Sequence, residues 1–133
     1  MEYPGYSVYE GSPSEESIYG DCSHIADFIE KCLIVDMSKV VVIGRSLGSA
    51  VASYFCTKLK VKSLVLLSPI GSTGRIAEVQ YGKIAKFIIK DRFDNISMAS
   101  KITSPTLIIH GNNDEIVPVS QVEMIHGTTF VIR

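Results

Sequence analysis

The sequence predicts an α/β fold with a parallel sheet and helices on both of its faces. Three short apolar runs, rich in Val, Ile and Leu, lie at 40–44, 63–69 and 105–111. None of them alternates with polar residues, which is typical of strands buried on both faces in parallel sheets. Segments with helical spacing separate these runs, and such alternation of strand and helix indicates parallel strands joined by right-handed crossovers.

The first helix is predicted from its start signal and its apolar stripe. Residues 3–14 are rich in Pro, Gly and Ser and are predicted to be a loop. Ser14 is a good N-cap, and the acidic Glu15 and Glu16 suit the positive end of a helix dipole. Apolar residues then recur at spacings of three and four as far as Leu33, which predicts a helix of about five turns.

The remaining elements follow in order along the chain. A second helix is predicted at 46–59, with small residues near its start. A long excursion at 71–104, similar to an insert or lid, separates the second and third strands. It is predicted to hold an amphipathic helix at 76–89 and a shorter helix at 96–102. A last helix is predicted at 120–126, and the tail 128–132 favours a strand.

Length and composition limit the class of protein. The chain has 133 residues, 46% of them hydrophobic, and a net charge of -1, so we expect one globular domain at 1–133. No basic surface indicates a nucleic-acid partner. The three cysteines match no metal-binding or redox spacing, and the apolar runs are too short to span a bilayer. The sequence therefore predicts a cytoplasmic protein that needs no metal or organic cofactor.

The motif that carries chemistry is Gly44-Arg45-Ser46-Leu47-Gly48, a G-x-S-x-G pattern between the first strand and the second helix. This context is that of a nucleophile elbow, a sharp turn that lifts a serine hydroxyl above the sheet. Ser46 is thus the candidate nucleophile, and the N–H of Leu47 the candidate donor to an oxyanion. A phosphate-binding or purely structural glycine turn is the alternative, although no dinucleotide or P-loop pattern is present.

Asp114 is the candidate acid for a catalytic triad. It follows the third strand, and the carboxyl ends of parallel strands meet at the edge of the sheet where ligands bind. In α/β-hydrolases the chain order is Ser, then Asp or Glu, then His. Asp114 could instead be only a turn-forming residue, and Glu115 is a second, weaker candidate acid.

The catalytic histidine cannot be placed from the sequence. His24 falls within the first helix and is expected to be solvated. His110 is expected to pack at the strand end or to bond to its own loop. His126 follows Asp114 by only twelve residues and is expected to be structural or solvated. None of the three follows a final strand, where the base of such a triad belongs.

Taken together, these motifs resemble the α/β-hydrolase superfamily, and most closely its eukaryotic α/β-hydrolase-domain proteins of the depalmitoylase, or acyl-protein thioesterase, type. The matching segments run in order as 3–6, Gly11, 14–16, 44–48, 67–69, 91–94, Ile96, 104–105, 110–111 and 114–115. The resemblance implies that Ser46 is the nucleophile, Asp114 the triad acid and Leu47 an oxyanion donor. It also implies that 76–89 forms a lid or a wall that contacts the acyl group.

The chain departs from that family pattern in several places. Ser7 stands where such proteins usually have Gly. The family's first strands, which carry the second oxyanion donor, and its last strand with the catalytic histidine are expected to be missing. The lipid-modified, Cys-rich N-terminus of the depalmitoylase branch is expected to be missing as well. We therefore expect a partial α/β-hydrolase fold.

Two functions are compatible with the sequence. The first is a serine hydrolase that cleaves an ester, thioester or amide of a small molecule or an acylated protein through an acyl-enzyme on Ser46. The alternative is a truncated or pseudoenzyme member that is catalytically incompetent, with activity near background. The amphipathic 76–89, with Lys83, Lys86 and Lys90, is also compatible with contact at a membrane surface. The oligomeric state is not predicted.

Overall fold

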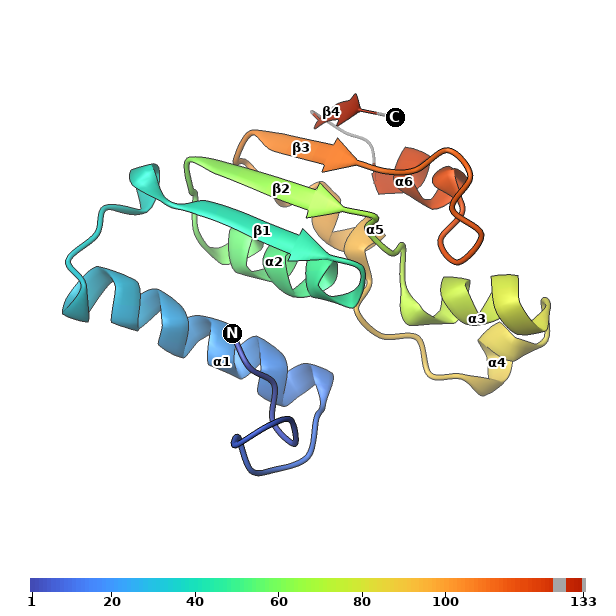
Figure 1. Cartoon of the computed structure of the whole chain (residues 1–133), viewed down its shortest axis with the longest axis horizontal. Coiled ribbons are helices and arrows are strands. Elements are labelled where there is room, and N and C mark those ends of the chain that lie inside the picture. Colours follow the sequence, from blue (N-terminus) through green and yellow to red (C-terminus); the bar gives the residue numbers. More distant parts are fainter. Residues whose placement is uncertain (126–128, 133) are drawn as a thin grey trace.

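A computed structural model describes residues 1–125 and 129–132 and contains a four-stranded parallel sheet in the order β1-β2-β3-β4 (Figure 1). The strands are β1 (Val41–Arg45), β2 (Ser63–Leu67), β3 (Thr106–Ile109) and β4 (Thr129–Ile132). Gly44 pairs with Leu66, and Leu66 with Ile108, so the three predicted apolar runs lie side by side. The α/β class, its parallel strands and the strand in the tail are confirmed.

The helices lie close to their predicted places. They are α1 (Glu15–Asp27), α2 (Leu47–Lys58), α3 (Thr73–Tyr81), α4 (Ala85–Ile88), α5 (Asn95–Ala99) and α6 (Val119–Ile125). A π-helical turn (Phe28–Cys32) continues α1, and a 3₁₀ turn (Met37–Lys39) precedes β1.

The N-terminus of α1 is held by a capping box. The Ser14 hydroxyl accepts a hydrogen bond from the Ser17 backbone N–H at 3.0 Å, and the Ser17 hydroxyl accepts one from the Ser14 N–H at 3.1 Å. Two backbone donors at the helix start are thereby satisfied. The predicted cap and its acidic first turn are both present.

The hydrophobic core lies on one face of the sheet, which differs in one detail from the predicted coverage of both faces. Leu64, Leu66 and Ile108 are fully buried on the face that α2 contacts, whereas Val41 and Ile43 are 46% and 65% exposed. The physical reason is the strand order. The strands advance in one direction across the sheet, and right-handed crossovers in one direction place every connecting helix on the same face.

Within the excursion between β2 and β3, two short helices, α3 and α4, stand where the sequence predicts the single helix 76–89. Helix α3 ends at Tyr81, and Gly82 follows with φ 87°, a left-handed conformation that glycine adopts without strain. Helix α4 then begins at Ala85. The apolar periodicity of 76–89 continues across this break, which is why the pattern predicts one helix.

Candidate active site

Ser46 occupies the turn between β1 and α2 with a backbone conformation that non-glycine residues rarely adopt. Its φ is 50° and its ψ is -122°. Such strain costs on the order of 1–3 kcal/mol and is typical of functional sites. The neighbouring strand holds the turn, because the Ser46 N–H donates to the Leu67 carbonyl at 3.0 Å. The side chain of Ser46 is exposed to solvent.

The close approach of α2 to β1 explains the first glycine of the motif. A Cβ at Gly44 would lie 2.5 Å from the Gly48 carbonyl oxygen and 2.6 Å from the Ala52 Cβ. A side chain at position 44 would therefore push the helix away from the strand and distort the turn. At Gly48 an added Cβ would meet only the Tyr3 hydroxyl, at an ordinary contact distance of 3.4 Å. Sterics within the described residues thus require glycine at position 44 but not at position 48.

Leu47 is the first residue of α2, directly after Ser46. The first N–H groups of an α-helix have no partner within the helix, and the helix dipole gives this end a partial positive charge. The Leu47 amide therefore stands next to the Ser46 hydroxyl at a terminus that favours developing negative charge. This is the position that an oxyanion donor of a nucleophile elbow occupies.

A buried network of hydrogen bonds, which the sequence did not predict, connects the backbone of Ser46 to α5. The Ser49 hydroxyl donates to the Ser46 carbonyl at 2.5 Å, and the Asn95 side-chain amide donates to the Ser49 hydroxyl at 2.9 Å. The same amide donates to the Ile70 carbonyl at 3.0 Å. Asn95 is fully buried and lies in α5, so the excursion is joined through its side chain to the backbone of Ser46.

Asp114 lies in the loop after β3. One of its carboxylate oxygens accepts hydrogen bonds from the backbone N–H groups of Ile116 and Val117, at 3.0 and 2.9 Å. The bond from Val117, reinforced by Ile116, the nearby His110 and the Ser68 hydroxyl, lowers the pKa of Asp114 against the opposing effect of burial. Asp114 is therefore a turn-forming residue, and it also keeps an ionised carboxylate whose second oxygen is outside the turn. Glu115 is exposed beside it.

The two described histidines occupy the positions expected for structural or solvated residues. His24 is exposed on α1, 4.0 Å from the Asp21 carboxylate. His110 is buried, and its Nε2 lies 2.7 Å from the Val117 carbonyl oxygen. Because a carbonyl oxygen only accepts, this Nε2 carries a proton and donates it to the loop. Within the described part of the chain, neither histidine is hydrogen-bonded to Ser46, and His126 lies outside that part.

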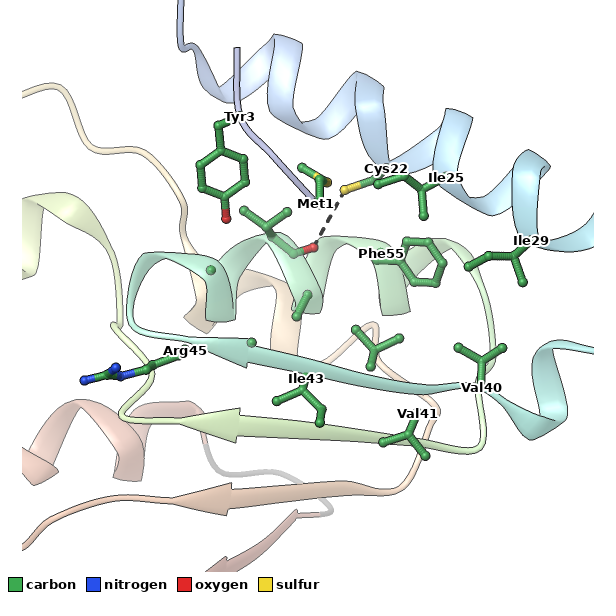
Figure 2. Close-up of a pocket in the computed structure, with 15 residues that line it drawn as sticks. Met1, Tyr3, Cys22, Ile25, Ile29, Val40, Val41, Ile43, Arg45 and Phe55 are labelled. Atoms are coloured by element: carbon green, nitrogen blue, oxygen red, sulfur yellow. Dashed lines mark hydrogen bonds between the residues drawn. The ribbon is translucent and has the colours of Figure 1, made fainter. Parts of the chain in front are cut away.

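Two cavities flank the elbow. The larger, about 460 Å³, runs along β1 between α1 and α2, with Ile25, Ile29 and Phe55 among its apolar walls (Figure 2). It reaches Gly44, Arg45 and Gly48, but Ser46 does not line it. The smaller, about 100 Å³, lies beside Leu47 and is walled by residues that include Arg92 and Phe93.

Two further properties concern the described residues as a set. Among them, no group of three or more His, Cys, Asp or Glu side chains is placed to hold a metal ion. No helix that the structure describes is long and apolar enough to cross a membrane.

Comparison with known proteins extends these observations. A family model described as serine hydrolase (FSH1) matches residues 4–129. The α/β-hydrolase domain-containing protein 17C of Mus musculus is 31% identical over 119 residues, which are 90% of this chain and 36% of that protein. Protein 17B of Xenopus laevis is 33% identical over 119 residues, 90% of this chain and 40% of that protein. The chain thus spans a little over a third of the length of these relatives.

Solved structures agree on the fold. An α/β hydrolase from Vibrio vulnificus superimposes with a TM-score of 0.85 at 15% identity, over 98% of this chain and 53% of that one. A lipase-esterase related protein from Clostridium acetobutylicum gives a TM-score of 0.70 at 15% identity, over 98% of this chain and 71% of that one. The resemblance to α/β-hydrolases expected from the motifs is confirmed.

Proposed function

Because this chain belongs to the serine hydrolase (FSH1) family, we propose that it carries the nucleophile of an acyl-transfer hydrolase, and that this nucleophile is Ser46. The observation that carries the proposal is the strained backbone of Ser46 at a junction of strand and helix. If the turn had only a structural role, glycine at position 46 would remove the backbone strain. A nucleophile has to be a serine despite that strain. Gly44 and the Ser49–Asn95 network hold the strained turn in place.

In the proposed reaction the Ser46 oxygen attacks the carbonyl carbon of an ester, thioester or amide. A base takes the hydroxyl proton, and the negative charge that forms on the carbonyl oxygen is stabilised by the Leu47 N–H at the start of α2. Collapse of this intermediate expels the alcohol, thiol or amine, which leaves with the proton. Water then releases the acyl group as a carboxylic acid and regenerates Ser46.

Asp114 is the proposed acid of this site. Its lowered pKa keeps it ionised at neutral pH, as an acid that orients and stabilises a histidine must be. Ser68, which contributes to the lowered pKa of Asp114, follows β2, the strand between those that carry Ser46 and Asp114. Acyl groups carried on a protein thiol are the proposed substrate class, on the ground of the resemblance to depalmitoylase-type proteins.

A second candidate, a hydrolase fold that lacks activity on its own, is favoured by a specific observation. Neither His24 nor His110 bonds to Ser46, and a missing base lowers the rate by roughly 10²–10⁴-fold. The two candidates differ in whether this chain supplies its own base. They share the elbow, so one experiment tests both.

The experiment is labelling with a fluorophosphonate, with and without added imidazole, followed by mapping of the adduct by mass spectrometry. We expect a single adduct on Ser46 that is absent in Ser46→Ala and kept in the control Ser100→Ala, an exposed serine at the end of α5. Labelling without imidazole supports a complete site, and labelling only with imidazole supports the incompetent fold. No adduct under either condition, or one that persists in Ser46→Ala, contradicts the proposed nucleophile.

A further inference from the structure

The tip of the excursion, residues 79–90, presents large apolar side chains to solvent. Tyr81, Ile84 and Ile88 are 75%, 73% and 77% exposed, and Val79 and Ile89 are also exposed. Ile84 and Ile88 are four residues apart and therefore share one side of the short α4. The main hydrophobic cluster includes Ile70 and Phe93, which flank residues 73–92, but none of the exposed apolar side chains of 79–90. These apolar residues therefore have no part in holding the main fold together.

The excursion is closed at its base, which holds the tip in place as a unit. The Thr73 N–H donates to the Arg92 carbonyl at 3.0 Å, and the Arg92 N–H donates to the Thr73 hydroxyl at 2.9 Å. One turn further, the Gly74 N–H donates to the Asp91 carboxylate at 2.8 Å. Helices α3 and α4 pack against each other above this base. Substitutions at the tip should consequently leave the rest of the molecule folded.

Residues 73–92 of the excursion carry a net charge opposite in sign to that of the rest of the chain. Residues 73–92 contain five basic and two acidic residues, a net charge of +3. Since the whole chain carries -1, the other residues together carry -4. Exposed lysines at 83 and 90 lie on both sides of the apolar α4. Apolar side chains flanked by lysines on an otherwise acidic molecule complement a surface that is itself apolar and negatively charged.

The position of the tip relative to the elbow suits such a surface. The carboxyl ends of β1, β2 and β3 point toward the end of the molecule that carries α3 and α4 (Figure 1). Ser46 follows β1 directly and therefore lies at this same end. A surface that contacts the tip would thus face the end of the sheet that carries the elbow.

We propose that residues 79–90 dock on an anionic lipid membrane surface. Tyr81, Ile84 and Ile88 enter the boundary between headgroups and acyl chains, and Lys83 and Lys90 pair with lipid phosphates and carboxylates. The docking is peripheral and reversible, because it combines a small apolar area with a few charges. The proposal does not depend on Ser46 acting as a nucleophile, so its test requires no activity.

The test is flotation of the 133-residue chain with vesicles in a density gradient, in which bound protein rises and aggregates sink. Vesicles of equimolar phosphatidylcholine and phosphatidylserine are compared with vesicles of phosphatidylcholine alone. We expect flotation with the anionic vesicles, weakened by added salt, and little with the neutral ones. Lys83→Gln with Lys90→Gln, and separately Ile84→Ser with Ile88→Ser, should each weaken binding on the order of tenfold or more.

Matched controls use residues of the same type away from the tip. Lys39→Gln with Lys60→Gln removes two exposed lysines, and Val8→Ser with Ile34→Ser removes two exposed apolar side chains. Both control pairs should float like the unmodified chain. Wild-type protein that fails to float, or tip variants that float as well as the controls, overturns the proposal. So does a change in oligomeric state of the tip variants without vesicles, which would make the tip a protein contact.

Discussion

Ser46 has a strained backbone and is also the proposed nucleophile. The strain can be measured from the stabilities of two variants at this position. At an ordinary position glycine is about 0.5–1 kcal/mol less stable than alanine. At Ser46, where φ is 50°, alanine keeps the strained Cβ and glycine removes it. We therefore expect Ser46→Gly to be more stable than Ser46→Ala by about 1 kcal/mol, measured by urea or thermal unfolding.

A Ser46→Gly variant that is more stable than Ser46→Ala reverses the usual order of glycine and alanine, and this reversal identifies the strained backbone. Both variants should lose fluorophosphonate labelling. Ser100→Gly and Ser100→Ala form a control pair at a residue with ordinary helical φ of -67°. There alanine should be the more stable of the two. If Ser46→Ala is the more stable variant at position 46 as well, the strained conformation of the elbow is not the one that the protein adopts.

The carboxylate of Asp114 makes the stability of the fold depend on pH. Its pKa is lowered from 3.8, first by the hydrogen bond from the Val117 N–H, so folding favours the ionised form. This contribution is complete above the unfolded pKa and is lost as the pH falls through the lower folded pKa. We expect unfolding midpoints to fall on acidification below about pH 4, and to fall less steeply in Asp114→Asn, whose amide oxygen still accepts from the loop.

Asp36 provides the comparison for that measurement, because it is an exposed aspartate whose pKa is also lowered by a local turn, at Ser38. Asp36→Asn should also reduce the dependence of the unfolding midpoint on acid pH, and its effect should add to that of Asp114→Asn. An acid dependence that is the same in the unmodified chain and in Asp114→Asn would show that the turn bonds do not depend on the charge.

At the scale of single residues, local sequence predicts the members of the site that lie next to a structural landmark. Ser46, Leu47 and Gly44 are found from a pattern between a strand and a helix, and Asp114 from its place after β3. Asn95 is different, because its partner Ser49 lies 46 residues away along the chain. A polar residue in the first turn of a helix is ordinarily exposed or part of a cap, so no periodicity indicates that Asn95 is buried.

At the scale of elements, Asn95 couples α5 to the start of α2, and this coupling can be tested. Asn95→Ala removes the donor to the Ser49 hydroxyl and the Ile70 carbonyl in a fully buried position. We expect a loss of about 1–3 kcal/mol in the free energy of unfolding. We also expect slower labelling of Ser46, on the order of tenfold, because the carbonyl that Ser49 holds belongs to the elbow.

The control for this prediction lies in the same helix. Ser97→Ala changes an exposed hydroxyl that donates to the Asp94 carbonyl, and should affect neither quantity appreciably. The concentration dependence of labelling separates the effects: a displaced elbow lowers the maximal rate, whereas lost binding raises the half-saturating concentration. A destabilised Asn95→Ala that labels at the wild-type maximal rate would reduce Asn95 to a purely structural residue.

The excursion marks the limit of what periodicity predicts about elements. The apolar spacing of 76–89 is real, but Gly82 interrupts the helix and the apolar residues face solvent. Apolar periodicity indicates which residues share a side of a helix. It does not indicate whether that side packs on the protein core or faces the surroundings. The strands β1, β2 and β3 were predictable because each is a short apolar run bounded by turn residues.

At the scale of the whole molecule, the strand order determines which surfaces are covered. The sequence predicts a parallel sheet, but not that its strands advance in one direction only. That order puts the crossover helices on one face and leaves Val41 and Ile43 of the edge strand β1 exposed. The continuous apolar run of β1, typical of a strand buried on both faces, is therefore buried on only one.

Two of the exposed apolar surfaces within the described residues are the edge strand β1 and the tip of the excursion, and we expect them to behave differently. In the sheet that the structure describes, β1 is an edge strand with a strand partner on one side only, and Val41 and Ile43 are exposed there, which favours pairing with another strand. We expect the isolated chain to associate with rising concentration in sedimentation velocity. Ile43→Lys should shift this association to higher concentration, because a lysine on an edge strand opposes strand pairing. Val8→Lys, at an exposed loop residue, should leave it unchanged.

Substitutions at the tip of the excursion should have the opposite effects on self-association and on membrane binding from a substitution in β1. Ile84→Ser with Ile88→Ser should weaken flotation with anionic vesicles and leave self-association as it is, whereas Ile43→Lys should reduce self-association and leave flotation as it is. If either change affects both measurements equally, the two surfaces act as one general apolar patch. Separate responses would assign the edge of the sheet to strand pairing and the basic tip to the membrane, because the tip combines exposed apolar side chains with a net positive charge.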